Sequence, residues 1–253
     1  MVRAALSFGF TADLVVLTGV AMTVGLAPAG WLTGLIVGLA VNLLLVRGLA
    51  RAGRRVGPAD QVTLLRAALV GGVAALTVDS FLAPVSIPVR AAAAPVPVPV
   101  SVLVVLASIA LALDAVDGPV ARGTGTMSAV GARFDMETDA LLILVLSCYD
   151  ARLFGWWVLT IGLLRYAFVA AGVAWAWLRA PSPPRHWCKV VAAVQGIVLT
   201  AVAPALLPSA VAVGLILISL ALLTESFGRE VLWLGRHRGV TQPPILVGAG
   251  VNA

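Results

Sequence analysis

The sequence predicts an all-α polytopic integral membrane protein with about eight transmembrane helices. Hydrophobic residues make up 61% of the chain and charged residues only 11%, and the mean hydropathy is +1.06. A soluble domain keeps roughly a quarter of its residues charged, so this chain cannot cover a water-facing surface. Apolar segments recur at about the 20-residue length that crosses a bilayer. No polar stretch is long enough to form a second globular unit.

The apolar segments define the expected helices in order along the chain. The first follows Arg3 and resembles a signal peptide, but it continues to about residue 28 without a convincing cleavage site. We therefore expect it to be a retained helix. The expected helices span residues 11–28, 31–47, 61–79, 99–121, 134–149, 155–178, 187–207 and 210–232.

Basic residues predict the orientation of these helices. The net charge is +6, and Lys189 is the only lysine. Arginines follow the second helix, lie between the fourth and fifth and between the sixth and seventh, and close the chain. With the N-terminus in the cytoplasm, all these segments are cytoplasmic, and only Arg90 and Arg152 fall in opposite loops. The pattern indicates a multi-pass protein of the plasma (inner) membrane, and no binding of nucleic acid.

Four aspartates stand out against this apolar background: Asp114, Asp117, Asp135 and Asp139. The first two are three residues apart and the last two are four apart, so each pair lies on one face of its helix. The two expected helices are consecutive and antiparallel, and a short cytoplasmic segment joins them. Both pairs are therefore expected to converge near the cytoplasmic edge of the membrane, where charged residues call for a functional explanation.

Carboxylates that converge in this way repel one another unless cations neutralise them. Oxygen ligands in this number suit Mg²⁺ or Mn²⁺, as one ion or two, with phosphate oxygens completing the coordination. The alternative is a set of helix-end charges paired with Arg66, Arg122 and Arg133, but pairing alone does not require this spacing.

Small residues beside the aspartates fit a ligand site. Gly118 and Ala121 leave room for a ligand to approach the helix backbone. Gly131, one turn before the second aspartate pair, allows a tight turn or close packing. Arg122 can bind phosphate or fix a carboxylate. Pro119 is expected either to kink its helix or to mark the end of it.

Together these residues resemble the signature of the CDP-alcohol phosphotransferase family, and they match it at all eight fixed positions. A second element, at the start of the third expected helix, resembles the family's Asn-x-x-Thr-x-x-Arg nucleotide-binding element. It consists of Asp60, Thr63 and Arg66, with the aspartate in place of the asparagine. The signature itself is Asp114-Ala-Val-Asp117-Gly118-Pro-Val-Ala121-Arg122, followed at fixed gaps by Gly131, Asp135 and Asp139.

The resemblance covers about residues 58–232 and implies a six-helix core preceded by two additional helices. Residues 1–57 are then two N-terminal helices and a basic linker, 58–235 the catalytic membrane domain and 236–253 a cytoplasmic tail. The resemblance further implies that metals on three aspartates hold the CDP diphosphate, while the fourth aspartate acts as general base and candidate ligand. In order these are Asp114, Asp117, Asp135 and Asp139, and the CDP group is expected beside Asp60, Thr63, Gly118, Ala121, Arg122 and Gly131.

The residues that bind the acceptor are harder to assign. Arg133 is a candidate for an acceptor phosphate or for lipid headgroups, and Arg165 for an acceptor phosphate or for a buried pair with Glu225. Lys189 and Gln195 resemble part of a Lys-x-Lys-Thr-x-x-Gln element of phosphatidylglycerophosphate synthases. Val191 and Ala192 replace the second lysine and the threonine of this element, so the identity of the acceptor stays open. Glu137 lies two positions from both Asp135 and Asp139, so it is expected to point away from them, toward headgroups.

The resemblance implies an enzyme of phospholipid biosynthesis, which moves a phosphatidyl group from CDP-diacylglycerol to the hydroxyl of a small acceptor and releases CMP. It also implies a homodimer in the bilayer. The alternatives are the same chemistry with a soluble CDP-alcohol donor and a lipid acceptor, or a cation transporter. Transporters commonly contain internal repeats, and the chain shows none. A catalytically silent scaffold would be expected to have lost an aspartate, and all four are present.

Overall fold

The computed structural model describes residues 2–51, 57–82, 96–123, 129–179 and 186–237. Within these ranges the chain forms eight α-helices, two short 3₁₀ helices and no strand, which confirms the all-α prediction. The 3₁₀ helices are Trp156–Val158 and Ala176–Arg179. The α-helices are α1 (Val2–Val24), α2 (Pro28–Arg51), α3 (Pro58–Leu82), α4 (Val98–Gly123), α5 (Ala129–Phe154), α6 (Leu159–Ala174), α7 (His186–Val202) and α8 (Ser209–Arg236).

Two of the expected helices differ clearly from those in the structure. The first helix begins at Val2, not at residue 11, and it stops at Val24 because Gly25 takes a positive φ of 70° that favours glycine. The single helix expected over residues 155–178 is divided. Gly155 has a φ of 104° at its start, and Trp175 becomes extended near its end.

Within the described residues, six of the eight α-helical regions contain a segment long and apolar enough to cross a membrane, fewer than the eight spans expected but consistent with a multi-pass protein. They belong to α1, α2, α3, α4, α8 and the stretch that joins the first 3₁₀ helix to α6. Of the remaining two α-helices, α7 is shorter, and α5 carries acidic residues, among them Asp135, Glu137 and Asp139.

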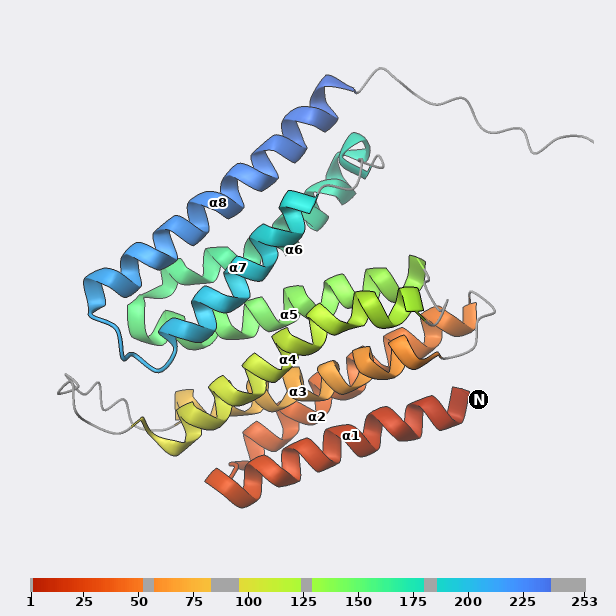
Figure 1. The fold of residues 1–253 in the computed structure, drawn as a ribbon, viewed down its shortest axis with the longest axis vertical. Coiled ribbons are helices and arrows are strands. Elements are labelled where there is room, and N and C mark those ends of the chain that lie inside the picture. The colour runs from red at the N-terminus through yellow and green to blue at the C-terminus, as the bar shows by residue number, and fades with distance from the viewer. Residues whose placement is uncertain (1, 52–56, 83–95, 124–128, 180–185, 238–253) are drawn as a thin grey trace, which may run out of the picture.

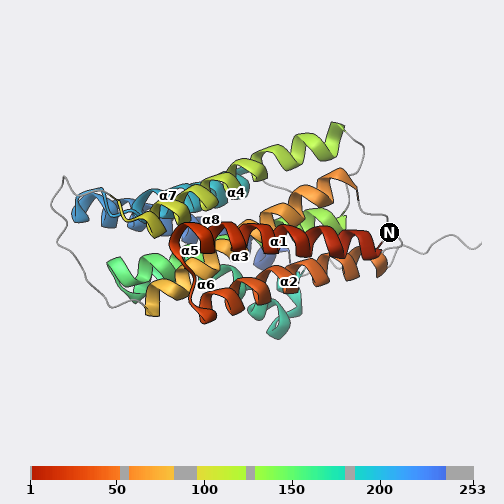
Figure 2. The same cartoon turned by 90° about the horizontal axis from the view of Figure 1, so that it is seen from below.

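Helix α3 lies at the centre of the bundle and contacts α1, α2, α4 and α5 (Figures 1 and 2). Of its membrane-spanning segment, 78% is buried. Small side chains, among them Ala67, Ala74 and Ala75, let the neighbouring helices approach its backbone closely. This position allows one helix to present side chains to both α4 and α5.

The two N-terminal helices pack directly onto this central helix. A Cβ atom added to Gly71 of α3 would lie 3.0 Å from the Gly34 carbonyl oxygen of α2, so the two backbones nearly touch. The Asp79 carboxylate of α3 accepts a 2.8 Å hydrogen bond from the backbone nitrogen of Ala27, next to the start of α2. The hairpin α1–α2 is therefore a structural part of the bundle that supports α3.

A close contact also holds α6 against α5. A Cβ atom added to Gly162 would lie 2.6 Å from the Leu144 Cα, so only glycine fits at this crossing. We expect Gly162→Ala to lower the free energy of unfolding by about 1–3 kcal/mol, measured by denaturation in mixed micelles. The matched control is Gly214→Ala on α8, where nothing lies within 4 Å. Equal stability of the two variants would contradict this packing.

Candidate metal centre

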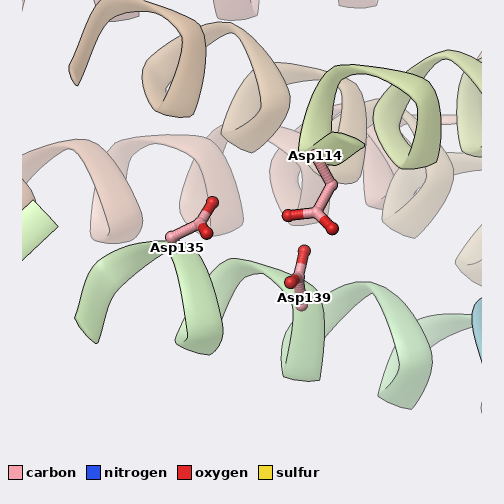
Figure 3. Close-up of side chains that lie close together, drawn as sticks. All are labelled: Asp114, Asp135 and Asp139. Carbon is pink, nitrogen blue, oxygen red and sulfur yellow. The ribbon is translucent and has the colours of Figure 1, made fainter. Parts of the chain in front are cut away.

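Three of the four predicted aspartates meet between α4 and α5. Asp114 extends from α4, and Asp135 and Asp139 extend from α5 one turn apart, with their carboxylates directed toward one another (Figure 3). One oxygen from each lies within 4.8 Å of the others. All three side chains are half-buried, so the cluster has an open side. The predicted convergence of the two helices is thus present in the structure.

A buried arginine joins these carboxylates from the central helix. Arg66 of α3 is only 2% exposed, and its Nη1 lies 3.1 Å from the Asp114 Oδ1. Its guanidinium also pairs with Asp135 through Nη1 and with Asp139 through Nη2. From the sequence, Arg66 was expected only as a pairing partner of the aspartates and not as a site residue. Its position one turn after Thr63, in the element that resembles a nucleotide-binding element, is the feature that could have indicated its place in the site.

The charges and donors of the cluster fit a divalent cation. Three carboxylates against one guanidinium leave a formal charge of −2. The donors are hard carboxylate oxygens, which suit Mg²⁺ or Mn²⁺. Lys189 of α7 is near enough to Asp114 for their charges to interact, although its side chain is exposed.

The rest of the signature lies at the end of α4 and the start of α5. Helix α4 continues past Pro119 to Gly123, so this proline does not end the helix. Gly131 lies one turn before Asp135 on α5 and is half-buried. Four predicted site residues lie in the last part of α4, where the structure describes the helix but not the surroundings of its residues, and their roles stay predictions. These are Asp117, Gly118, Ala121 and Arg122.

At the start of α3, Asp60 and Thr63 are both buried. The Asp60 carboxylate accepts a 2.7 Å hydrogen bond from the backbone nitrogen of Gly57, the residue before the helix. With Pro58 at the first helical position, this is the acidic half of a capping box. Asp60 thus has a capping role that the sequence comparison with asparagine did not suggest, and contact with CDP stays a prediction.

Arg165 is not brought to the cluster. Its Nη2 lies 2.7 Å from the Glu137 Oε1, which joins α6 to α5. At about 100° per residue, Glu137 faces away from the two aspartates on either side of it, so the pair lies behind the cluster. The alternative pairing with Glu225 was wrong, because that carboxylate pairs with Arg229 and accepts a 3.2 Å hydrogen bond from the Trp187 Nε1. Glu137 keeps 38% of its side chain exposed beside this pair, and its expected contact with headgroups stays a prediction.

The other acceptor candidates differ in their surroundings. Arg133 is exposed on α5, two residues before Asp135. Gln195 is fully buried, and its side-chain nitrogen donates a 2.9 Å hydrogen bond to the Ser219 carbonyl, so it links α7 to α8. Within the described residues, Lys189 is therefore the one member of the partial acceptor element whose charge interacts with the cluster, through Asp114.

A protein-family model described as CDP-alcohol phosphatidyltransferase matches residues 58–226. The chain belongs to this family. The match begins at the first residue of α3 and ends within α8, so helices α3–α8 form the family core and α1 and α2 precede it. Searches of curated proteins and of solved structures found no match.

Membership of the CDP-alcohol phosphatidyltransferase family identifies the chain as a transferase of phosphate-containing groups. The family uses a CDP-alcohol donor and a hydroxyl acceptor, and it generally depends on a divalent metal. The carboxylates that converge between α4 and α5 belong to the matched region.

Proposed function

We propose that the chain transfers a phosphatidyl group from CDP-diacylglycerol to the hydroxyl of a small acceptor and releases CMP. The observation that carries this proposal is the convergence of Asp114, Asp135 and Asp139 within 4.8 Å, in a chain whose family transfers such groups. Together with Asp117, these residues would hold Mg²⁺ or Mn²⁺, as one ion or two. The metal would supply charge stabilisation to the diphosphate and to the departing phosphate.

In the proposed reaction, Asp139 takes the proton from the acceptor hydroxyl. The hydroxyl oxygen then forms a bond to the β-phosphorus of the donor, and the bond from that phosphorus to the CMP oxygen breaks. CMP leaves with the electron pair of the broken bond. Asp139 suits the base role because its carboxylate is on the open cluster and 28% exposed, which allows a hydroxyl to reach it.

The surroundings of the cluster support a lipid donor and a water-soluble acceptor. The aspartates lie toward the ends of two helices in a bundle with six apolar candidate spans, so lipid tails can stay in the bilayer. The exposed cations Arg133 and Lys189 are proposed to meet the acceptor, whereas Arg165 is paired with Glu137 on the other face of α5. The pattern of arginines supports a cytoplasmic site in the plasma (inner) membrane. A homodimer follows from the family resemblance.

Product identification tests the donor and the acceptor together. The purified protein in detergent is supplied with CDP-diacylglycerol or a soluble CDP-alcohol and with a panel of acceptors, including glycerol 3-phosphate, inositol phosphate and diacylglycerol. We expect a phospholipid product, detected by mass spectrometry, only with CDP-diacylglycerol and one class of small acceptor. Product formed only from a soluble CDP-alcohol and a lipid acceptor would overturn the donor assignment.

A further inference from the structure

Arg66 is a cation that the chain itself supplies to the carboxylate cluster. Its guanidinium contacts Asp114, Asp135 and Asp139, and it joins α3 to both α4 and α5. The side chain is only 2% exposed, so water cannot replace these partners. A buried charge left without partners is strongly unfavourable, and the guanidinium therefore leaves the carboxylates only for another anion.

The same three carboxylates serve both the guanidinium and the expected metal. Arg66 contacts the Oδ1 atom of each carboxylate, and these carboxylates are the described ligands of the candidate centre. A divalent ion bound by them lies close to the guanidinium, and two cations at such a distance repel. The guanidinium also occupies lone pairs of these carboxylates, so fewer are left to ligate a metal.

A diphosphate can relieve this conflict. Its oxygens accept paired hydrogen bonds from a guanidinium, which matches phosphate geometry better than a point charge does. The three carboxylates are between 28% and 36% exposed, so a diphosphate reaches the cluster from the open side. Thr63, in the predicted nucleotide-binding element, precedes Arg66 by one helical turn.

We propose that Arg66 competes with the divalent metal for the three carboxylates, and that the donor diphosphate ends this competition by accepting the guanidinium's hydrogen bonds. The competition follows from the contacts, whereas the identity of the diphosphate rests on the proposed function. Metal and donor then bind cooperatively, and each raises the affinity for the other by the same factor. The enzyme holds its metal weakly until a donor arrives.

Mn²⁺ binding to the purified full-length protein tests this proposal without catalysis. Free Mn²⁺ is measured by electron paramagnetic resonance in detergent, with and without CDP as a soluble diphosphate. For Arg66→Gln without CDP we expect Mn²⁺ to bind at least about tenfold more tightly than to the wild type, because a positive charge beside the ligands is gone. CDP is expected to tighten Mn²⁺ binding about tenfold in the wild type and clearly less in the variant.

Arg229→Gln is the matched control. It removes one arginine charge from an exposed pair with Glu225 on α8, and Mn²⁺ affinity is expected to stay within about twofold of the wild type. If Arg66→Gln does not fold, Arg66→Met replaces it, because methionine keeps a long unbranched side chain, carries no charge and should likewise tighten Mn²⁺ binding. Unchanged or weaker Mn²⁺ binding in the folded Arg66 variant would overturn the proposal.

The binding assay also separates this proposal from the proposed reaction. An inactive wild type whose Arg66→Gln variant still binds Mn²⁺ more tightly would support the competition and reject the reaction. An active wild type with the same Mn²⁺ affinity as Arg66→Gln would reject the competition and leave the reaction intact.

Discussion

Replacing Asp139 with asparagine is expected to lower the rate of CMP release by about a thousandfold, within the range that general base catalysis contributes. Asparagine has the shape of aspartate and keeps an oxygen for Arg66, but it cannot take the acceptor proton. The expected loss is therefore in kcat, measured at saturating donor and acceptor. Raising the Mn²⁺ concentration is not expected to restore the rate, which separates a base from a residue that only binds metal.

Asp150→Asn is the control for this prediction. Asp150 lies on the same helix, is fully buried and is far along α5 from the cluster. The substitution makes the same chemical change outside the site, and CMP release is expected to stay within about twofold of the wild type, as for independent sites. An Asp139→Asn protein that folds and keeps more than about a tenth of the wild-type rate would exclude Asp139 as the base.

Removal of divalent metal is expected to lower CMP release at least about a hundredfold, because a metal supplies several kcal/mol of charge stabilisation in the transition state. Added Mg²⁺ or Mn²⁺ should restore the rate. Asp135→Asn should raise the metal concentration needed for half-maximal activity about tenfold or more, since loss of an outer-shell partner already has an effect of that size. The measurement is a metal titration of CMP release after chelation.

Glu137→Gln gives the matched control for the metal titration. It neutralises a carboxylate two residues from Asp135, on the opposite face of α5, where the pair with Arg165 lies. Its half-maximal metal concentration is expected to equal that of the wild type within about twofold, because the cluster keeps its ligands. Full activity in the presence of a chelator, or equal shifts in the two variants, would contradict a metal held by the aspartates.

The meeting of α4 and α5 was predictable because helical spacing decides which residues share a face. Asp135 and Asp139 are four residues apart, and Asp114 lies near the end of the preceding antiparallel helix. Glu137 was correctly expected to point away from them for the same reason. Its partner Arg165 was not predicted, because which helix faces the back of α5 depends on packing, and no periodicity within one helix reveals that.

The sequence indicated that Arg66 could pair with the aspartates, but not that it contacts three of them at once, because that depends on how α3 is rotated against α4 and α5. In the fold too, some features were predictable from the sequence and others depend on packing or on backbone conformation. Composition and segment length predicted the helices, whereas the extended backbone at Trp175, inside the helix expected over residues 155–178, had no signal in the local sequence. The packing of the first two helices on α3 depends on the near contact of Gly34 and Gly71. The sequence alone does not show which neighbouring backbone a glycine contacts.

The carboxylate cluster between α4 and α5 is proposed to perform metal-dependent transfer from a CDP-alcohol. The most direct test is CMP release by the purified protein from CDP-diacylglycerol, with Mg²⁺ or Mn²⁺ and a panel of acceptors, beside Asp139→Asn. Release that requires both metal and one acceptor, and that is lost in the variant, is the predicted result. No CMP release from any CDP-linked donor by folded, metal-bound protein would contradict the claim and make cation transport the next function to test.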